Sequence, residues 1–272
     1  MFGGAGSALV FMAAITSYSN SPPQSLGLIA LTLIGVGLFL VWLEIGRPWR
    51  FLHVFFHPQT SWMTREGSIA GVLFVLTFIG IACKIPFIMG IAGIAGLVFL
   101  FCQGQMLKAS KGIPSWLEPT IVRLIVVTGI CEGTALLLLF LCLQHNVPMV
   151  LNLACLVFLV TRIFSWLIYR KNLIESRVPT VTLSTLGKIH SIQVIAGNLI
   201  PVILIILSIA MPELATPTII SATLLIIITG WHMNFTIITR AAQVQGYRLN
   251  KVQRGRPNIR PPVRRKPDKF VF

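Results

Sequence analysis

The segment Ser25–Leu43, SLGLIALTLIGVGLFLVWL, runs for 19 residues without a charged side chain. An apolar run of about 20 residues is long enough to cross a lipid bilayer as a helix. The composition of the whole chain agrees with this, because 55% of its 272 residues are hydrophobic and only 11% are charged. An ordinary soluble domain has about a quarter of its residues charged. The sequence therefore predicts an integral membrane protein.

Seven further segments have the same character, so we predict an all-α, polytopic helical bundle with eight transmembrane helices. The first segment is short, and its small residues Gly3, Gly4, Gly6 and Ser7 favour close helix contact. Residues 1–239 are expected to form this domain, and 240–272 a basic cytoplasmic tail. The predicted spans are Gly3–Ser17, Ser25–Leu43, Gly67–Cys83, Ile85–Leu107, Thr120–Cys142, Val147–Tyr169, Ile189–Met211 and Thr216–Thr239.

Basic residues sort to one side of this predicted topology. Eight spans put both termini on the same side, together with nine basic residues of the loops and ten between Arg240 and Lys269, against Lys84 alone on the other side. Because cytoplasmic loops are rich in Lys and Arg, both termini are predicted to be cytoplasmic. The nine loop residues are Arg47, Arg50, Arg65, Lys108, Lys111, Arg170, Lys171, Arg177 and Lys188.

A charged connection joins the second and third segments. Glu44 ends one segment and Glu66 opens the next, so a helical hairpin brings both carboxylates to one bilayer depth. Ionisable groups at the mouth of a membrane bundle cost free energy unless they are paired, hydrated or used. We therefore expect the chemistry here. The alternative is structural: Arg47 and Arg50 would anchor the interface, and Glu66 would favour a helix N-terminus.

Two motifs carry a resemblance to a known family. The stretch LEIGRPWR (43–50), followed by TSWMTRE (60–66), resembles the DmsC/NrfD-type membrane subunits of molybdopterin oxidoreductases. Those subunits show an H-L-G-x-P turn and an S-W-x-S-R-E signature at these places, and GIPSW (112–116) is similar to their V-P-T-W-like segment. The variant here is closest to members associated with phenylacetyl-CoA:acceptor oxidoreductase. Glu44 stands where the family has His.

The resemblance implies a quinone-reactive membrane anchor. Family members bind menaquinone or ubiquinone near the bundle mouth, hold no metal or haem, and exchange electrons with an iron–sulfur ferredoxin-like subunit. A molybdopterin catalytic subunit acts on the substrate. The family's carboxylate maps to Glu66, which is expected to exchange protons with the quinone, with Glu44 assisting. Whether Glu44 keeps the proton role of His is open, because an unperturbed Glu has a lower pKa than His.

Further residues are expected around the quinone. Arg65 or Arg47 would stabilise an anionic quinone oxygen or hold a carboxylate. Trp62 would stack on the ring, although interfacial Trp also anchors membrane helices. His57 would relay protons to water. The resemblance implies partner subunits and a bacterial or archaeal inner membrane, and the charge sorting predicts that these partners and the proton exchange lie on its cytoplasmic side.

Polar residues inside the spans form a second group of candidates. Arg162 is counted among the expected quinone-binding residues, and it could pair with Glu132. The Glu132 carboxyl could belong to a proton path, or could contact Asn198 for structural reasons only. His190 and His232 raise the competing idea of a haem, against which the family resemblance argues.

Two other functions stay open at this point. Eight spans with buried Glu and Arg also suit a secondary transporter, although transporters often show paired repeats and broken helices in matching positions, and no repeat is visible in the sequence. A purely structural anchor is the third reading. The five cysteines form no CxxC pair, so the sequence indicates no iron–sulfur or zinc ligand set of its own.

Overall fold

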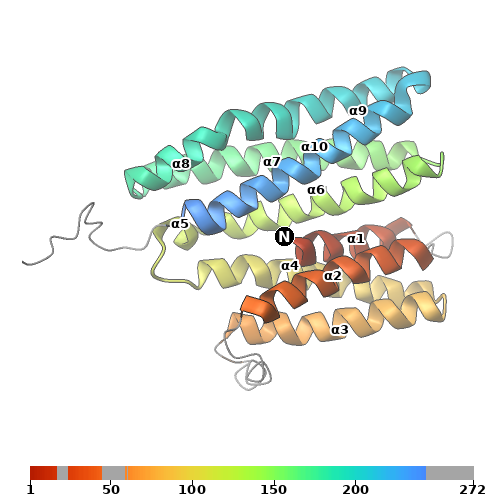
Figure 1. The fold of residues 1–272 in the computed structure, drawn as a ribbon, viewed down its shortest axis with the longest axis horizontal. Helices are drawn as coiled ribbons and strands as arrows, with labels where there is room; N and C mark the ends of the chain where they lie inside the picture. The colour runs from red at the N-terminus through yellow and green to blue at the C-terminus, as the bar shows by residue number, and fades with distance from the viewer. Residues whose placement is uncertain (17–23, 45–58, 60, 243–272) are drawn as a thin grey trace, which may run out of the picture.

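The structure is a computed structural model that describes residues 1–16, 24–44, 59 and 61–242. This part of the chain is helical throughout and contains no strand (Figure 1), which confirms the predicted all-α class. In order the elements are α1 (Phe2–Thr16), α2 (Gln24–Glu44), α3 (Trp62–Ala82), α4 (Pro86–Lys108), α5 (Pro114–Leu117), α6 (Thr120–Leu143), α7 (Met149–Glu175), α8 (Thr180–Ser191), η2 (Ile192–Leu199), α9 (Ile200–Ala210), η3 (Pro212–Leu214), α10 (Ala215–Phe235) and η4 (Thr236–Arg240).

Seven helices in the described residues are long and apolar enough to cross a membrane. The chain is therefore a multi-pass membrane protein. The remaining predicted span is α1, which has only 15 residues. At about 1.5 Å per residue such a helix is about 22 Å long, shorter than a bilayer core of about 30 Å. The seven helices are Gln24–Leu43, Trp62–Ala82, Pro86–Lys108, Thr120–Leu143, Met149–Glu175, Thr180–Ala210 and Pro212–Arg240.

Helix α1 lies at the centre of the bundle, packed against α2, α4 and α6. Its residues from Gly3 to Val10 are all buried, as expected for a helix that is apolar on every face. Small residues allow α2 and α4 to approach α1 closely, as expected from the glycines of α1. A Cβ atom added at Gly37 would lie 2.6 Å from the Gly3 nitrogen, and one added at Gly96 would lie 2.5 Å from the Ser7 carbonyl oxygen.

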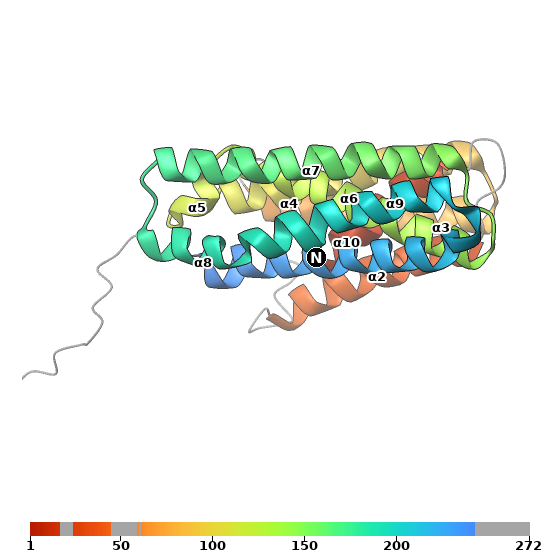
Figure 2. The ribbon, with the colours of Figure 1, turned by 90° about the horizontal axis from the view of Figure 1, so that it is seen from above.

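The long helices form two groups with the same order of contacts (Figures 1 and 2). In the first ring, which we define as α1–α4, each helix packs on the next and α4 returns to α1. In the second ring, defined as α6, α7, α8–η2–α9 and α10, the same closed order is repeated. The rings meet where α1 and α4 pack against α6. This similarity was not visible in the sequence.

The turns between helices follow one pattern at three places. The second residue after each helix has positive φ, and a proline two or three positions later is the first residue or the N-cap of the next helix. At Lys84, for example, φ is 54°, and the N–H of Ile85 donates to the Gly80 carbonyl at 3.2 Å. This bond satisfies a carbonyl that the helix end leaves free. The three residues are Lys84, His145 and Arg177.

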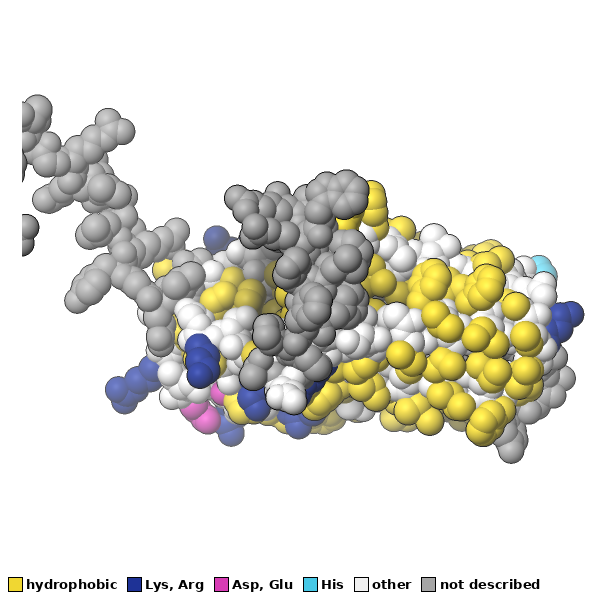
Figure 3. All heavy atoms as spheres, turned by 90° about the horizontal axis from the view of Figure 1, so that it is seen from below, with side chains coloured by type: hydrophobic (Ala, Val, Ile, Leu, Met, Phe, Trp, Pro, Cys, Tyr) yellow, Lys and Arg dark blue, Asp and Glu magenta, His cyan; other side chains and the backbone are white. Residues whose placement is uncertain are grey.

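The alternating helices bring most described basic residues to one end of the bundle, the end where α5 lies (Figures 1 and 3). Lys108, Arg170 and Lys188 belong to this end, whereas Lys84 lies in the turn between α3 and α4 at the other. The sorting predicted from the sequence is therefore present among the described residues. Helix η4 ends at Arg240, and the predicted tail lies outside the described residues from position 243.

Candidate functional site

The start of α3 positions the predicted carboxylate Glu66. The Ser61 hydroxyl caps the helix by accepting from the Thr64 N–H at 3.3 Å, so the helix begins at Trp62. This is five residues earlier than the predicted start at Gly67. Glu66 therefore lies beyond the first turn, which contains no acidic residue, and the predicted place at the helix N-terminus is wrong. The Glu66 side chain is half-buried and turned toward the bundle.

Arg65 and Trp62 lie beside Glu66 on the same turn of α3. The Arg65 guanidinium carbon is 4.4 Å from the centre of the Trp62 ring, a cation–π contact. Its Nη2 also donates to the Gln59 carbonyl at 2.8 Å. The Trp62 ring meets Phe101 of α4 edge-on, with 6.1 Å between ring centres. Three of the predicted site residues are thus brought together at the start of α3.

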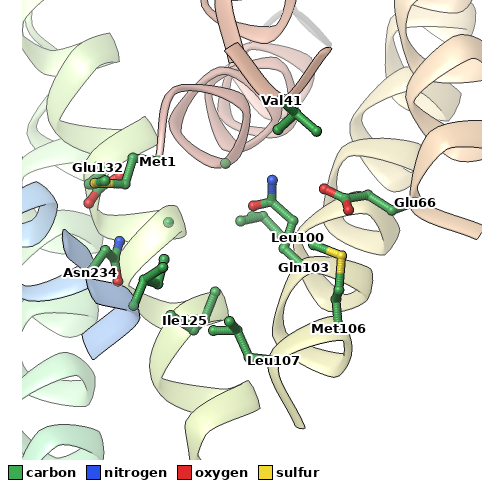
Figure 4. Close-up of a pocket in the computed structure, with 13 residues that line it drawn as sticks. Met1, Val41, Glu66, Leu100, Gln103, Met106, Leu107, Ile125, Glu132 and Asn234 are labelled. Carbon is green, nitrogen blue, oxygen red and sulfur yellow. The ribbon is translucent and has the colours of Figure 1, made fainter. Parts of the chain in front are cut away.

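A cavity of about 200 Å³ extends from Glu66 into the bundle between the two rings (Figure 4). It is bounded by α1, α2, α3, α4, α6, α10 and η4, so both rings contribute to its wall. Polar side chains on this wall are few and come from four different helices. The residues that line it are Met1, Gly4, Val41, Glu66, Leu100, Gln103, Met106, Leu107, Ile125, Gly129, Glu132, Asn234 and Ile238.

The cavity runs from an exposed apolar rim to a deeply buried carboxyl. Val41 and Ile238 at the rim are 48% and 36% exposed, whereas Glu132 is 1% exposed. Glu132 lies twelve residues into α6, about 18 Å from the start of that helix at about 1.5 Å per residue. Glu66 lies four residues from the start of α3, at the same end of the bundle (Figure 1). The two carboxyls therefore occupy different depths of one cavity.

Several polar atoms on the cavity wall lack an internal partner. The Gln103 amide faces the Glu66 carboxylate across the cavity (Figure 4). Deeper in, Glu132 Oε1 and Asn234 Oδ1 are buried without a hydrogen bond. The Trp231 indole faces Glu132, but its Nε1 does not reach hydrogen-bond geometry with the carboxyl. Because buried polar atoms are almost always paired, these atoms indicate a place for water or for a polar ligand.

Arg162 belongs to a separate polar cluster in the second ring. The residue is 0% exposed. Its Nη2 donates to the Gly197 carbonyl at 2.6 Å and to Thr229 Oγ1 at 3.2 Å, and its Nη1 donates to the Ile226 carbonyl at 3.3 Å. Gly197 lies in the π-helical segment η2. Arg162 does not line the cavity, so the structure does not bring it together with Glu66.

The GIPSW motif holds η4 in place. The Trp116 indole donates to the Ile237 carbonyl at 3.0 Å, and the Ser115 hydroxyl donates to the Ala241 carbonyl at 3.2 Å. The Tyr169 hydroxyl of α7 donates to the Ser115 carbonyl at 2.8 Å. The motif therefore joins α5 to the second ring, and its contacts are those of a structural clamp.

The structure does not describe the side chains of the remaining predicted site residues. Glu44 ends α2, but its side chain lies outside the described residues, as do Arg47 and His57 altogether. Their roles stay predictions. Among the described residues, no group of three or more His, Cys, Asp or Glu is placed to hold a metal ion.

Sequence reasoning missed two amides and undervalued one carboxyl. Gln103 and Asn234 line the cavity, and neither was proposed from the sequence. The available signal was their polarity inside otherwise apolar helices, since polar residues in spans often mark function. Glu132 was proposed for a proton path, but with Asn198 as a possible contact. Asn198 Nδ2 instead donates to the Gln193 carbonyl within its own helix, at 2.6 Å.

Comparison of the sequence with protein-family models and with curated proteins finds no match. The resemblance to the DmsC/NrfD-type subunits therefore depends on the quoted motifs alone.

Proposed function

We propose that this chain is the quinone-reactive membrane anchor of a multi-subunit oxidoreductase. The observation that carries the proposal is the cavity with Glu66 on its wall. The cavity offers an ionisable group, Glu66, to a ligand. Such a ligand can arrive from the lipid, because the rim residues Val41 and Ile238 are apolar and exposed. A quinone is such a ligand, being soluble in lipid and exchanging protons along with its electrons.

The size and chemistry of the cavity suit a quinone ring. At about 200 Å³ the cavity is smaller than drug-sized ligand sites, which measure about 300–1,000 Å³. A single substituted ring is an appropriate occupant, with its tail leaving past the apolar rim. A proton donor or acceptor must lie within hydrogen-bond reach of the ring oxygen. In this proposal Glu66 is that group, and Gln103 orients it.

The orientation and the partners are part of the same proposal. The basic end of the bundle supports a cytoplasmic location for it and for both termini, with α1 as an eighth membrane segment. An iron–sulfur ferredoxin-like subunit and a molybdopterin catalytic subunit would dock at this end and exchange electrons with the menaquinone or ubiquinone of a bacterial or archaeal inner membrane. Glu44, Arg47 and His57 are proposed to complete the cavity mouth, with Arg65 and Trp62 beside it.

The experiment that tests the proposal compares Glu66→Gln with Glu213→Gln. Glu213 is an exposed acid in η3, at the opposite end of the bundle. The full chain, tagged and purified from its host with its bound partners, is assayed for electron exchange with a short-tailed quinone. Loss of a general acid or base usually costs about 10²–10⁴-fold in rate, so E66Q should lose at least about 100-fold, while E213Q should match the unmodified complex.

Two results would contradict the proposal. One is an E66Q complex that turns over quinone at the full rate. The other is purification of the chain without any iron–sulfur partner, together with no binding of quinone in detergent. An absorbance spectrum of the same preparation tests the expectation that the chain holds no haem. A bound haem would give a Soret band.

A secondary transporter is the second candidate, and the two similar rings favour it. Transporters are often built from repeats, with broken helices at matching positions. The second ring contains such an interruption, η2, beside Arg162, but α3, the third helix of the first ring, is α-helical from Trp62 to Ala82. The matching break is therefore missing in the described residues. Uptake of a solute by proteoliposomes that contain only this chain would support the transporter.

A further inference from the structure

The cavity has a second carboxyl, and it lies on the wall opposite Glu66. Figure 4 shows Glu66 on one side and Glu132 on the other, with Leu100 and Gln103 between them. Glu66 is near the mouth and half-buried, whereas Glu132 is 1% exposed. In the described residues, no salt bridge within 4.0 Å is formed by Glu132. Its charged neighbours, the Met1 amino group and Arg162, act on it only through space.

The packing around Glu132 leaves room for a carboxyl. A Cβ atom added at Gly230 of α10 would collide with Glu132 Oε1, so only glycine at that position admits the side chain as it lies. Oε1 itself has no hydrogen bond, and neither has Oδ1 of Asn234, which is 6% exposed and lines the same cavity. Two unpartnered oxygens on the wall of one cavity indicate that an O–H or N–H group from a ligand or water belongs there.

We propose that Glu132 is a second proton-exchanging carboxyl of this cavity, acting on the quinone oxygen away from Glu66. The inference depends on the proposed function and adds a residue to it. A quinone carries its two oxygens at opposite ends of the ring, and the two carboxyls occupy opposite walls. Each oxygen thus has its own acid or base.

The reaction balances with two protons and two electrons. In the reductive direction, one-electron carriers of the iron–sulfur partner supply two electrons, and each quinone oxygen takes up one proton. Glu66 and Glu132 each lose a proton and become carboxylates, while the two C=O groups become C–O–H groups. Two protons from the aqueous phase then return to the carboxylates, carried by water that enters from the cavity mouth. Oxidation of a quinol runs the same steps in reverse.

Arg162 adds an electrostatic contribution from the second ring. It acts on Glu132 through space, as the Met1 amino group does more strongly, although the hydrogen bonds of Arg162 go to Gly197, Ile226 and Thr229. A fixed positive charge nearby stabilises the carboxylate that remains after Glu132 gives up its proton. In this arrangement Arg162 is a positioning residue that does not touch the quinone.

The main test measures quinone turnover and quinone binding in the purified complex for Glu132→Gln. The amide has the shape of the carboxyl but carries no exchangeable acidic proton. We expect turnover to fall by about 100-fold, while the affinity for a redox-inactive quinone analogue changes less than threefold. A merely structural role would instead lower binding and thermal stability together. Full turnover in a folded E132Q complex would overturn the inference.

A second measurement needs no variant. Dicyclohexylcarbodiimide modifies carboxyls in apolar surroundings, and mass spectrometry of the full chain locates the added mass. We expect modification of Glu132, with at least fivefold protection by a short-tailed quinone. Modification of Glu132 at the same rate with and without quinone would contradict the inference. This experiment also decides the matter if E132Q does not fold.

The two proposals fail in different ways. Loss of turnover in E66Q with full turnover in E132Q keeps the quinone function and removes the inference about Glu132. Full turnover in both variants, with no quinone protection of either carboxyl, removes the quinone site altogether. Loss in both variants, with retained binding of the analogue, supports both proposals.

Discussion

In the second ring the charged group Arg162 donates to three acceptors, whereas in the first ring the Glu66 carboxylate faces a cavity. Both groups lie in apolar helices, where an unsatisfied polar atom costs several kcal/mol. At Arg162, backbone carbonyls and a hydroxyl of the protein accept the hydrogen bonds and so remove this cost. At Glu66, water or a ligand has to supply the hydrogen bonds. Hydrogen-bond completion, more than charge or depth, therefore separates a structural group from a candidate reactive group.

The largest expected effect is at Arg162. Replacement by Met removes the donors to Gly197 and Ile226, and should lower the free energy of unfolding by about 3 kcal/mol or more, as when one partner of a buried polar network is lost. Arg162→Lys should not restore stability, because an ammonium cannot reach acceptors on two helices at once. Thermal melting in detergent measures both variants. An unchanged melting temperature for Arg162→Met would break the comparison.

The second effect tests the contact between α1 and its neighbours. Gly96→Ala places a methyl group 2.5 Å from the Ser7 carbonyl oxygen, and overpacking of this kind costs about 1–3 kcal/mol. Gly71→Ala is the matched control, because nothing lies within 4 Å of its added Cβ. Melting temperatures of the two variants should therefore differ clearly. Equal values would show that α1 does not pack against α4 as described.

The third effect concerns the clamp on the second ring. Trp116→Phe keeps most of the ring's volume but loses the bond from the indole to the Ile237 carbonyl, which is 3.0 Å long. A hydrogen bond of this kind contributes about 1 kcal/mol. The loss should appear as a modest drop in melting temperature, with quinone turnover unchanged. A large loss of turnover would instead assign the motif to the reactive site.

The smallest effect is a gain in stability. Lys84 has a positive φ of 54°, a conformation that costs an ordinary residue about 1 kcal/mol and glycine almost nothing. Lys84→Gly should therefore stabilise the turn between α3 and α4 by a few tenths to about 1 kcal/mol, after allowing for the greater freedom of glycine in the unfolded chain. Denaturant titration measures it, and a loss of stability would show that the Lys84 side chain has another role.

The sequence predicted the long helices well because unbroken apolar runs report lipid contact directly. It also placed most basic residues at one end, since the segments alternate in direction. It could not show how the helices pack. Gln103 and Asn234 are 131 positions apart in the sequence, and only the bundle brings them to one cavity. Likewise, nothing in the local pattern around Arg162 indicated that Gly197 and Ile226 would satisfy it, because both acceptors are backbone carbonyls.

The most direct measurement of the central claim is photolabelling of the purified full chain with a short-tailed azidoquinone. We predict that the label attaches to residues of the cavity wall, at Gln103–Leu107 of α4 and at Asn234–Ile238, where α10 continues into η4, and that unlabelled quinone competes for these sites. Label confined to the surroundings of Arg162, or spread over the lipid-facing helices without competition, would contradict the account.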